Sequence, residues 1–514
     1  MANPLYDTLF GRHAGQSAPF LHLADGSTVS YDAFLRLTAR FAHALRNADL
    51  APGDRLAAQV EKSPQALAVY AACVQAGIVF LPLNTGYTAD ELAYFVTDSG
   101  ARLLLCDSAR TDALQVVADQ AGALIMTLDA DGTGTLPEAA KGLPETFETT
   151  PREADDLAAF LYTSGTTGRS KGAMLTQTNL LSNAEVLVDC WRFTAKDVLL
   201  HALPIFHTHG LFVATNIVLL AGASMIFLPK FDLDQMIDNL PRATSMMGVP
   251  TFYTRLLDDA RFTRDLVAHM RLFVSGSAPL LAETHVAFEG RTGHRILERY
   301  GMTETNMNTS NPYDGARRAG TVGFPLPGVE LKITDPQTGT ELPQGEIGLI
   351  EVRGPNVFKG YWNMPEKTAE ELRENGFFIT GDLGMIDDQG YVQIVGRNKD
   401  LIISGGYNIY PKEIELLLDE QPGVLESAVI GVPHADFGEA AVAVIVAGPG
   451  APPDLDAIRA ALGAKLAKFK QPKRLVLAEA LPRNAMGKVQ KNLLRAAHAD
   501  SFAAAGAARA WTAR

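Results

Sequence analysis

The chain has 514 residues, of which 47% are hydrophobic and 20% charged, and its formal net charge is -13. This length exceeds what one compact core normally holds, so we expect two or three packed units. The acidic balance argues against nucleic-acid binding, which needs clustered lysine and arginine, although a local pocket can still attract an anionic nucleotide.

The composition also indicates a compartment. Three cysteines without a Cys-x-x-Cys pair predict neither a disulfide framework nor a zinc cluster, and they suit a reducing cytoplasm. The N-terminus lacks the basic and apolar regions of a signal peptide. Residues 211–229 carry no charge, but residues 222–224 divide them into a buried helix and a buried strand rather than a membrane span. We therefore expect a cytoplasmic protein without a membrane partner.

Apolar runs and helical patterns alternate over the first 300 residues. The pattern predicts helices over 31–47 and 63–76 and strands over 79–83, 102–106, 158–162 and 272–275, which is typical of α/β layers with parallel sheets. Between about 328 and 396, short strands (329–334, 348–352 and 391–395) predict an antiparallel sheet or small barrel. After Arg397 a new α/β unit begins, with a helix over 413–419 and a strand over 428–432. We place the domain boundary there, giving domains of residues 1–397 and 398–514, and expect the last twenty residues to be loosely held.

A dense cluster of small polar residues follows the strand over 158–162. Residues 163–172 read Thr-Ser-Gly-Thr-Thr-Gly-Arg-Ser-Lys-Gly, and we expect a helix to begin near Asn179 with Thr178 as its cap. Small residues let backbone N–H groups approach phosphate oxygens, and Lys171 adds a positive charge, so phosphate binding is favoured over a plain surface loop. A Walker loop is excluded because Ser170 breaks its spacing. Residues 168–172 also match the Gly-x-Ser-x-Gly of a hydrolase elbow, so a serine hydrolase remains a second interpretation.

This cluster resembles the signature loop of the adenylate-forming (AMP-binding) superfamily. Similar further motifs occur in the same order at 276–280 (Gly-Ser-Ala-Pro-Leu), 300–304 (Tyr-Gly-Met-Thr-Glu), 380–382 (Thr-Gly-Asp), 396–399 (Gly-Arg-Asn-Lys) and 482–488 (Pro-Arg-Asn-Ala-Met-Gly-Lys). The resemblance implies an α/β multidomain fold, with a large N-terminal domain of two α/β sheets plus a small β-barrel and a small mobile α+β C-terminal domain. It implies an acid–thiol ligase that uses ATP, Mg²⁺ and coenzyme A and forms an acyl-adenylate.

The resemblance also implies site residues. Lys488 would be the catalytic cation, acting with Thr303, Glu304 and His207, while Glu304 and Thr167 would hold Mg²⁺. A helix-capping role is the alternative for Glu304, because residues 303–306 suit the first turn of a helix. Tyr300 would stack on adenine, Asp382 would bind the ribose, and Lys399 would be the hinge between domains. The implied nucleotide and coenzyme A contacts are Thr163, Ser164, Gly165, Thr166, Thr167, Lys171, Gly276, Ser277, Ala278, Pro279, Glu298, Arg299, Tyr300, Gly301, Met302, Asp382, Arg397, Lys399, Gly405 and Gly406.

Polar residues near the expected acid pocket are similar to those of the malonyl-CoA synthetases in this superfamily. The implied substrate contacts are His207, Arg255, Ser277 and Met302, with Arg255 pairing with the distal carboxylate of malonate. Its spacing instead allows Arg255 to pair with Asp258 and Asp259 on a surface helix. His207 suggests no metal, since no further ligand lies at suitable spacing, and it is given a pocket-gating role without proton transfer.

The resemblance therefore implies a malonate–CoA ligase, with methylmalonate or another short acid as the alternative substrate. A non-catalytic nucleotide sensor or a carrier-loading module is disfavoured, because no carrier domain follows Lys488. In this superfamily the matching lysine is acetylated, so the resemblance also implies that a protein lysine acetyltransferase and deacetylase act on Lys488.

Overall fold

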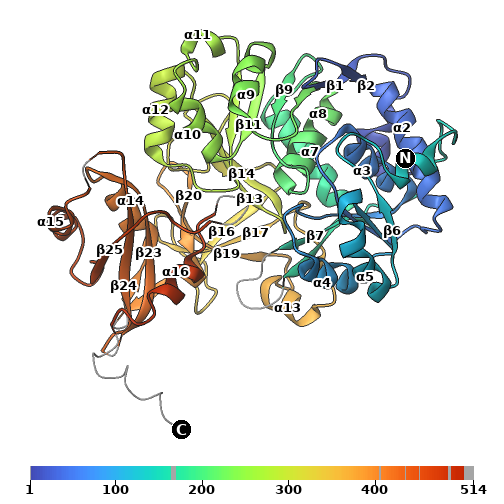
Figure 1. Cartoon of the computed structure of the whole chain (residues 1–514). Helices are drawn as coiled ribbons and strands as arrows, with labels where there is room; N and C mark the ends of the chain where they lie inside the picture. The colour runs from blue at the N-terminus through green and yellow to red at the C-terminus, as the bar shows by residue number, and fades with distance from the viewer. Residues whose placement is uncertain are drawn as a thin grey trace. The chain divides into compact units, whose positions relative to one another are not determined.

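The computed structural model describes residues 2–163, 170–404, 407–434, 436–450, 452–483 and 488–502 (Figure 1). The chain divides into two compact units. Unit 1 comprises residues 1–331, 352–378 and 390–392, and unit 2 comprises residues 332–351, 379–389 and 393–514. Because each unit draws on separate stretches of the chain, the expected domain boundary between residues 397 and 398 stays a prediction.

A nine-stranded sheet forms one half of unit 1, in the order β15-β14-β13-β12-β11-β9-β10-β1-β2. The five strands from β10 to β13 in this order are mutually parallel, as the alternation of apolar runs and helices predicted. The bounds are β1 (Pro19–Leu23), β2 (Thr28–Ser30), β9 (Val198–His201), β10 (Ser224–Phe227), β11 (Ser245–Gly248), β12 (Leu272–Ser275), β13 (Leu297–Met302), β14 (Asn306–Ser310) and β15 (Phe324–Pro325).

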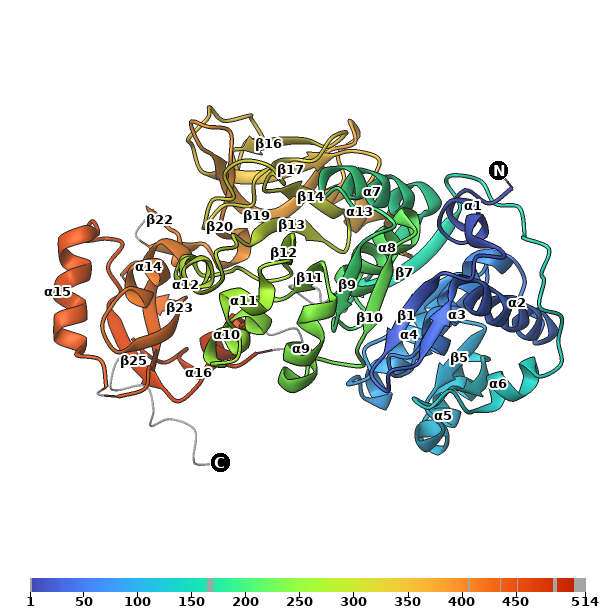
Figure 2. The same ribbon diagram turned by 90° about the horizontal axis from the view of Figure 1, so that it is seen from above.

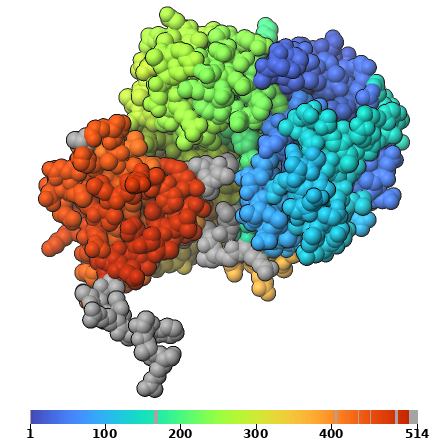
Figure 3. Space-filling model, in the orientation of Figure 1, coloured from blue at the N-terminus to red at the C-terminus, as the bar shows by residue number. Residues whose placement is uncertain are grey.

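A seven-stranded sheet forms the other half, in the order β18-β8-β7-β4-β3-β5-β6. Its strands are β3 (Arg55–Gln59), β4 (Val79–Pro82), β5 (Leu103–Cys106), β6 (Leu124–Thr127), β7 (Leu157–Thr163), β8 (Lys171–Thr176) and β18 (Gly360–Tyr361). Strand β4 is buried along its whole length, which explains its uninterrupted apolar sequence. In the space-filling view, the first 160 residues form one continuous packed surface (Figure 3).

Helices cover these sheets because each presents an apolar face to them. Tyr253 of α10 and Phe288 of α12 pack edge to face on the core under β11 and β12, and Figure 2 shows both helices beside these strands. The helices of unit 1 are α1 (Pro4–Leu9), α2 (Tyr31–Asn47), α3 (Pro64–Ala76), α4 (Ala89–Ser99), α5 (Thr111–Ala121), α6 (Thr135–Ala140), α7 (Gln177–Cys190), α8 (Asn216–Ala221), α9 (Leu233–Asn239), α10 (Pro250–Asp258), α11 (Arg264–Val267), α12 (Ala282–Thr292) and α13 (Pro365–Glu371).

Unit 2 combines a four-stranded sheet with a smaller α/β body. The first has the order β16-β17-β19-β20 and lies where the sequence predicted an antiparallel sheet or barrel. Its strands are β16 (Glu330–Thr334), β17 (Gly348–Arg353), β19 (Phe378–Ile386) and β20 (Val392–Arg397). The second contains β21 (Ile402–Ser404), β22 (Tyr407–Ile409), β23 (Val424–His434), β24 (Gly438–Ala447) and β25 (Arg474–Ala478), with α14 (Pro411–Asp419), α15 (Leu455–Lys465) and α16 (Lys491–Ala497). Ile414, Leu418 and Ile458 fill the core of this body.

The uncharged stretch over 211–229 is a buried helix followed by a buried strand, as predicted. A π-helical segment, His209–Thr215, leads into α8, and Gly222 ends α8 in the left-handed conformation before β10. Within the described ranges, the structure contains no helix with the length and apolar composition needed to cross a membrane.

The elements after the phosphate-loop motif differ from the prediction. Lys171 begins strand β8, which pairs antiparallel with β7, and α7 starts only after this strand. Thr176 caps α7 through a reciprocal capping box with Asn179, so the prediction of Thr178 as the cap was wrong. Ser170 therefore precedes a strand rather than a helix, and the strand-to-helix turn of a hydrolase elbow is missing there.

Candidate active site

The carboxyl ends of parallel strands bring together most of the candidate residues of unit 1. Strands β9, β11, β12 and β13 are hydrogen-bonded neighbours, and the segments that follow them carry His207, Arg255, Ser277 and Glu304. Ligands of open α/β sheets bind outside the carboxyl ends of the strands. The sheet thus collects, at one edge, residues that lie almost 100 positions apart in the chain.

The β7–β8 hairpin fixes both ends of the phosphate-loop motif. Thr163 and Lys171 are partners in the strand register, and Thr163 Oγ1 lies 3.4 Å from the carbonyl oxygen of Lys171. Ser164, Gly165, Thr166 and Thr167 lie outside the described residues. The hairpin therefore places one hydroxyl and one ammonium group opposite each other at the base of this loop.

Glu304 lies in the tight turn between β13 and β14, where it is buried. Thr163 Oγ1 donates to its Oε1 at 3.3 Å, and the hydroxyl of Tyr361 lies 3.1 Å from the same atom. Because the turn joins two antiparallel strands, the helix-capping alternative for Glu304 is wrong. Glycine is required at position 301, since a Cβ there would fall 1.9 Å from the carbonyl oxygen of Asn306.

The donor set around Glu304 fits magnesium only in part. No cluster of three or more His, Cys, Asp or Glu side chains that could hold a metal occurs in the part of the chain that the structure describes. Mg²⁺ is often bound by one or two carboxylates together with substrate phosphates and water. A buried carboxylate beside a phosphate-loop motif therefore suits a cation that arrives with a nucleotide.

A buried arginine lies behind the Gly-Ser-Ala-Pro motif. Arg299 of β13 is 4% exposed, and its Nε and Nη2 atoms have no hydrogen-bond partner among the described residues. Burial lowers its pKa to about 9, with a small opposing effect from Tyr253. Gly276 packs against the guanidinium group. A buried cation without a counter-ion is costly, so this position favours an anionic ligand.

His209 is a neighbour of this site that the sequence analysis did not assign. Its Nδ1 lies 3.2 Å from Ser277 Oγ, while its buried Nε2 has no partner within the described ranges. Burial and then the charge of Arg299 hold the pKa of His209 well below its ordinary value, so the ring is neutral. Ser277 itself has a positive φ of 71°, an uncommon conformation for a residue other than glycine. The His-Thr-His pattern in the sequence was the available signal for His209.

Arg255 and His207 lie in more open surroundings. Arg255 is exposed on α10, with its guanidinium 5.6 Å from the ring centre of Phe231. Asp259 pairs instead with Arg261, and the described residues show no ion pair between Arg255 and Asp258 or Asp259. His207 is half-buried beside Phe206.

The remaining predicted contacts of unit 1 differ in exposure. Glu298 is buried, and its side chain faces His285 of α12 at 3.3 Å; burial raises its pKa, and the histidine partly opposes this. The residues that are half-buried around the β13–β14 turn and the β12 end are Ala278, Tyr300, Met302 and Thr303, while Pro279 is exposed.

Unit 2 carries the other predicted residues. Arg397 Nε contacts Asp382 Oδ1 at 2.7 Å, so the structure brings this predicted pair together. Lys399 is exposed, and partial desolvation lowers its pKa, which Asp400 partly offsets. Lys488 is exposed, and Gly405 and Gly406 lie outside the described residues.

Both the sequence and the fold of this chain are similar to those of known proteins. The AMP-binding enzyme family matches residues 11–362, and the AMP-binding enzyme C-terminal domain matches residues 413–488. A malonate–CoA ligase from Arabidopsis thaliana is 38% identical over 455 residues, covering 82% of this chain and 74% of the relative. A feruloyl-CoA synthase from an Amycolatopsis species is 37% identical over 475 residues, covering 91% and 94%. The crystal structure of ATP-bound MatB from Rhodopseudomonas palustris superposes with a TM-score of 0.96 at 57% identity, covering 98% of this chain and all of that one. The chain therefore belongs to the AMP-binding enzyme family, has the adenylate-forming fold, and is an AMP-forming acid–thiol ligase that uses ATP.

Proposed function

We propose that this chain is a malonate–CoA ligase, which converts ATP, malonate and coenzyme A into malonyl-CoA, AMP and pyrophosphate through malonyl-AMP. Relatives that act on malonate and on ferulate are almost equally identical to it, at 38% and 37%. Malonate–CoA ligases from Arabidopsis thaliana and Mus musculus, at 38% and 36% identity, support malonate as the acid, and the chemistry of the pocket adds to this support.

The buried guanidinium of Arg299 is the observation that supports a dicarboxylate. One carboxylate of malonate attacks the α-phosphate of ATP, and the other needs a cation in a site away from water. Among the described residues, two nitrogen atoms of Arg299 have no hydrogen-bond partner, and Ser277 and His209 add polar groups close by. An aromatic or aliphatic acid with one carboxylate would have no second anionic group to compensate this cation. We propose Arg299 as the principal contact of the distal carboxylate and the exposed Arg255 as a second contact.

The attack joins two anions, so cationic and dipolar groups must offset their repulsion. In our proposal Thr163 and Lys171 bind phosphate oxygens together with the loop between them, and Thr303 contributes a further hydroxyl. Glu304, with Thr167, would hold Mg²⁺, which supplies charge neutralisation on the phosphates. The carboxylate of malonate needs no general base, because it is already ionised at neutral pH.

Unit 2 contributes the ribose contacts and the catalytic cation in this proposal. Asp382 accepts hydrogen bonds from the ribose hydroxyls, and Arg397 orients Asp382 through their ion pair. Lys488 stabilises the charge that develops during adenylation, Lys399 is the hinge, and Gly405 and Gly406 line the path of the thiol. We also propose Lys488 as an acetylation site and the cytoplasm as the compartment, which the unpaired cysteines Cys73, Cys106 and Cys190 support.

Exchange of labelled pyrophosphate into ATP tests the acid directly. We expect exchange with malonate, weaker exchange with methylmalonate, and little with acetate, butyrate or ferulate. Equal exchange with butyrate and malonate would show that no cation selects the second carboxylate. Product analysis should find AMP, and turnover without ATP would instead support a hydrolase.

A further inference from the structure

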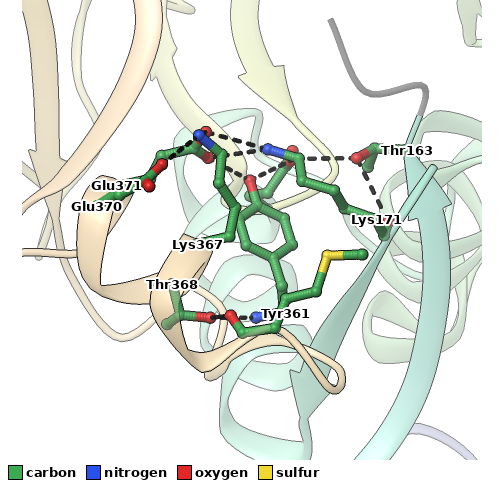
Figure 4. Close-up of polar contacts among 9 residues, drawn as sticks. Thr163, Lys171, Tyr361, Lys367, Thr368, Glu370 and Glu371 are labelled. Atoms are coloured by element: carbon green, nitrogen blue, oxygen red, sulfur yellow. Dashed lines mark hydrogen bonds and ion pairs between the residues drawn. The ribbon is translucent and has the colours of Figure 1, made fainter. Parts of the chain in front are cut away.

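The ammonium group of Lys171 is already engaged in this structure. Its Nζ lies 3.0 and 3.1 Å from the two carboxylate oxygens of Glu371, the last residue of α13, and 4.1 Å from the ring centre of Tyr361. Figure 4 shows the side chains of Lys171, Tyr361 and Glu371 pointing toward one another. Both charged side chains are largely shielded, with exposed fractions of 15% and 23%. Such a pair is stronger than a pair on an open surface.

Glu371 has two other donors that do not depend on Lys171. The Tyr361 hydroxyl lies 2.7 Å from its Oε2, and Lys367 Nζ lies 3.0 Å from its Oε1. Burial alone would raise the pKa of Glu371, but hydrogen bonds from Tyr361, Lys171 and Lys367 bring it below the ordinary value. The carboxylate is therefore ionised and would stay compensated if Lys171 moved away.

The backbone fixes this carboxylate beside the phosphate-loop hairpin. Strand β18 pairs antiparallel with β8, so Tyr361 lies next to the strand that begins at Lys171. Thr368 Oγ1 accepts a hydrogen bond from the backbone N–H of Tyr361 at 2.9 Å, which ties α13 to β18. Glu371 thus approaches Lys171 from a rigid element and not from a loop.

We propose that Glu371 is a positioning residue: it holds Lys171 as a counter-ion before the nucleotide binds, and the triphosphate of ATP displaces it. The carboxylate and the phosphates compete for one ammonium group, and the triphosphate carries more charge. Release leaves no buried unpaired charge, since Tyr361 and Lys367 remain on Glu371. This inference depends on the proposed role of Lys171 as a phosphate ligand.

Substitution of Glu371→Gln removes the competing charge while keeping the size of the side chain. We expect ATP to bind about fivefold or more tightly to this variant, measured by isothermal titration calorimetry, because ATP no longer has to displace a carboxylate. Adenosine has no phosphate, so its affinity should not change. Glu370→Gln is the matched control: Glu370 neighbours Glu371 and pairs with Lys367, yet it has no bond with Lys171.

A double-mutant cycle with Lys171→Met separates the two proposals. We expect Lys171→Met alone to weaken ATP binding about tenfold or more, and Glu371→Gln to have no further effect in that background. Unchanged ATP affinity in Lys171→Met would refute the phosphate role of Lys171. Weaker binding in Lys171→Met, together with unchanged or weaker binding in Glu371→Gln, would refute only the counter-ion role of Glu371. If Glu371→Gln does not fold, Glu371→Asp, which retracts the carboxylate by one methylene, should show the same tightening to a smaller degree.

Discussion

Gly276 lies so close to Arg299 that a Cβ atom at position 276 would fall 2.3 Å from the guanidinium Cζ. The glycine of the Gly-Ser-Ala-Pro motif therefore makes room for a buried cation from the neighbouring strand. Gly276 directly follows β12, Arg299 belongs to β13, and these two strands are parallel partners, so the sheet sets this close approach. The cation and the strained Ser277 beside it occupy one small region.

Replacing Arg299 should remove most of the selection for malonate. We expect Arg299→Met to lower kcat/KM for malonate about 100-fold or more, because hydrogen bonds to charged groups contribute about 1.5–3 kcal/mol each. Arg255→Ala should lower it only about tenfold, since Arg255 is exposed and its charge is screened by water. Steady-state kinetics with malonate and butyrate measure both effects. A larger decrease of kcat/KM for malonate in Arg255→Ala than in Arg299→Met would reverse our ranking of the two contacts.

The β13–β14 turn should tolerate no side chain at position 301. We expect Gly301→Ala to reduce the free energy of unfolding by about 2 kcal/mol or more, because the new Cβ would overlap the carbonyl oxygen of Asn306. Gly290→Ala is the control: it lies inside α12 with no atom within 4 Å of the added Cβ, so it should stabilise by up to about 1 kcal/mol. Urea denaturation measures both changes. Equal free energies of unfolding for the two variants would contradict the close approach of residue 301 to the carbonyl oxygen of Asn306.

Acidification should destabilise the protein in part through His209. Its pKa is depressed in the folded state, whereas the unfolded chain takes up a proton near pH 6.5. The free energy of unfolding should therefore fall as the pH drops below about 6.5, by up to about 1.4 kcal/mol per pH unit for this group. We expect His209→Asn to lose less stability than the natural protein between pH 7.5 and 5.5 in urea titrations. The exposed His269→Asn should behave like the natural protein, and identical slopes in all three would exclude a buried neutral His209.

Lys488 should be needed for adenylation and not for thioester formation. We expect Lys488→Ala to lower pyrophosphate exchange about 100-fold or more, because the charge that develops during adenylation would lose the cation assigned to stabilise it. Transfer of the acyl group from supplied malonyl-AMP to coenzyme A should persist. Enzyme acetylated at Lys488 should likewise lose adenylation and keep acyl transfer. The control Lys468→Ala, which removes another exposed lysine of unit 2, should retain both half-reactions. Equal loss of both half-reactions would argue against the assigned role.

Local sequence patterns predicted many of the helices and strands. Elements whose structure depends on contacts with distant parts of the chain were not predicted. The helix over 31–47 and the strand over 272–275 have the expected bounds, because their apolar spacing and caps are local properties. The strand that begins at Lys171 was missed because it starts within a run of glycine, serine and lysine, which signals a loop. Its β-structure comes from pairing with β7, which no local pattern reveals.

The resemblance to the adenylate-forming superfamily implied many candidate site residues but not their partners. Asp382 and Arg397 were both assigned to the ribose, and their ion pair follows from the fold. Glu371 and Tyr361 were not predicted, because a glutamate in a short polar helix has no distinctive sequence signal. Arg299 was assigned to the nucleotide, and only its burial, with no hydrogen-bond partner for Nε and Nη2 in the described part of the chain, favours the acid instead.

The hairpin ladder fixes Thr163 and Lys171 as anchors at the two ends of the phosphate-loop motif. Because strand hydrogen bonds hold both anchors, we expect them to keep their places when the segment between them is replaced by that of a relative. Grafting experiments at this site should thus alter phosphate binding independently of the acid pocket, whose residues follow strands of the other sheet.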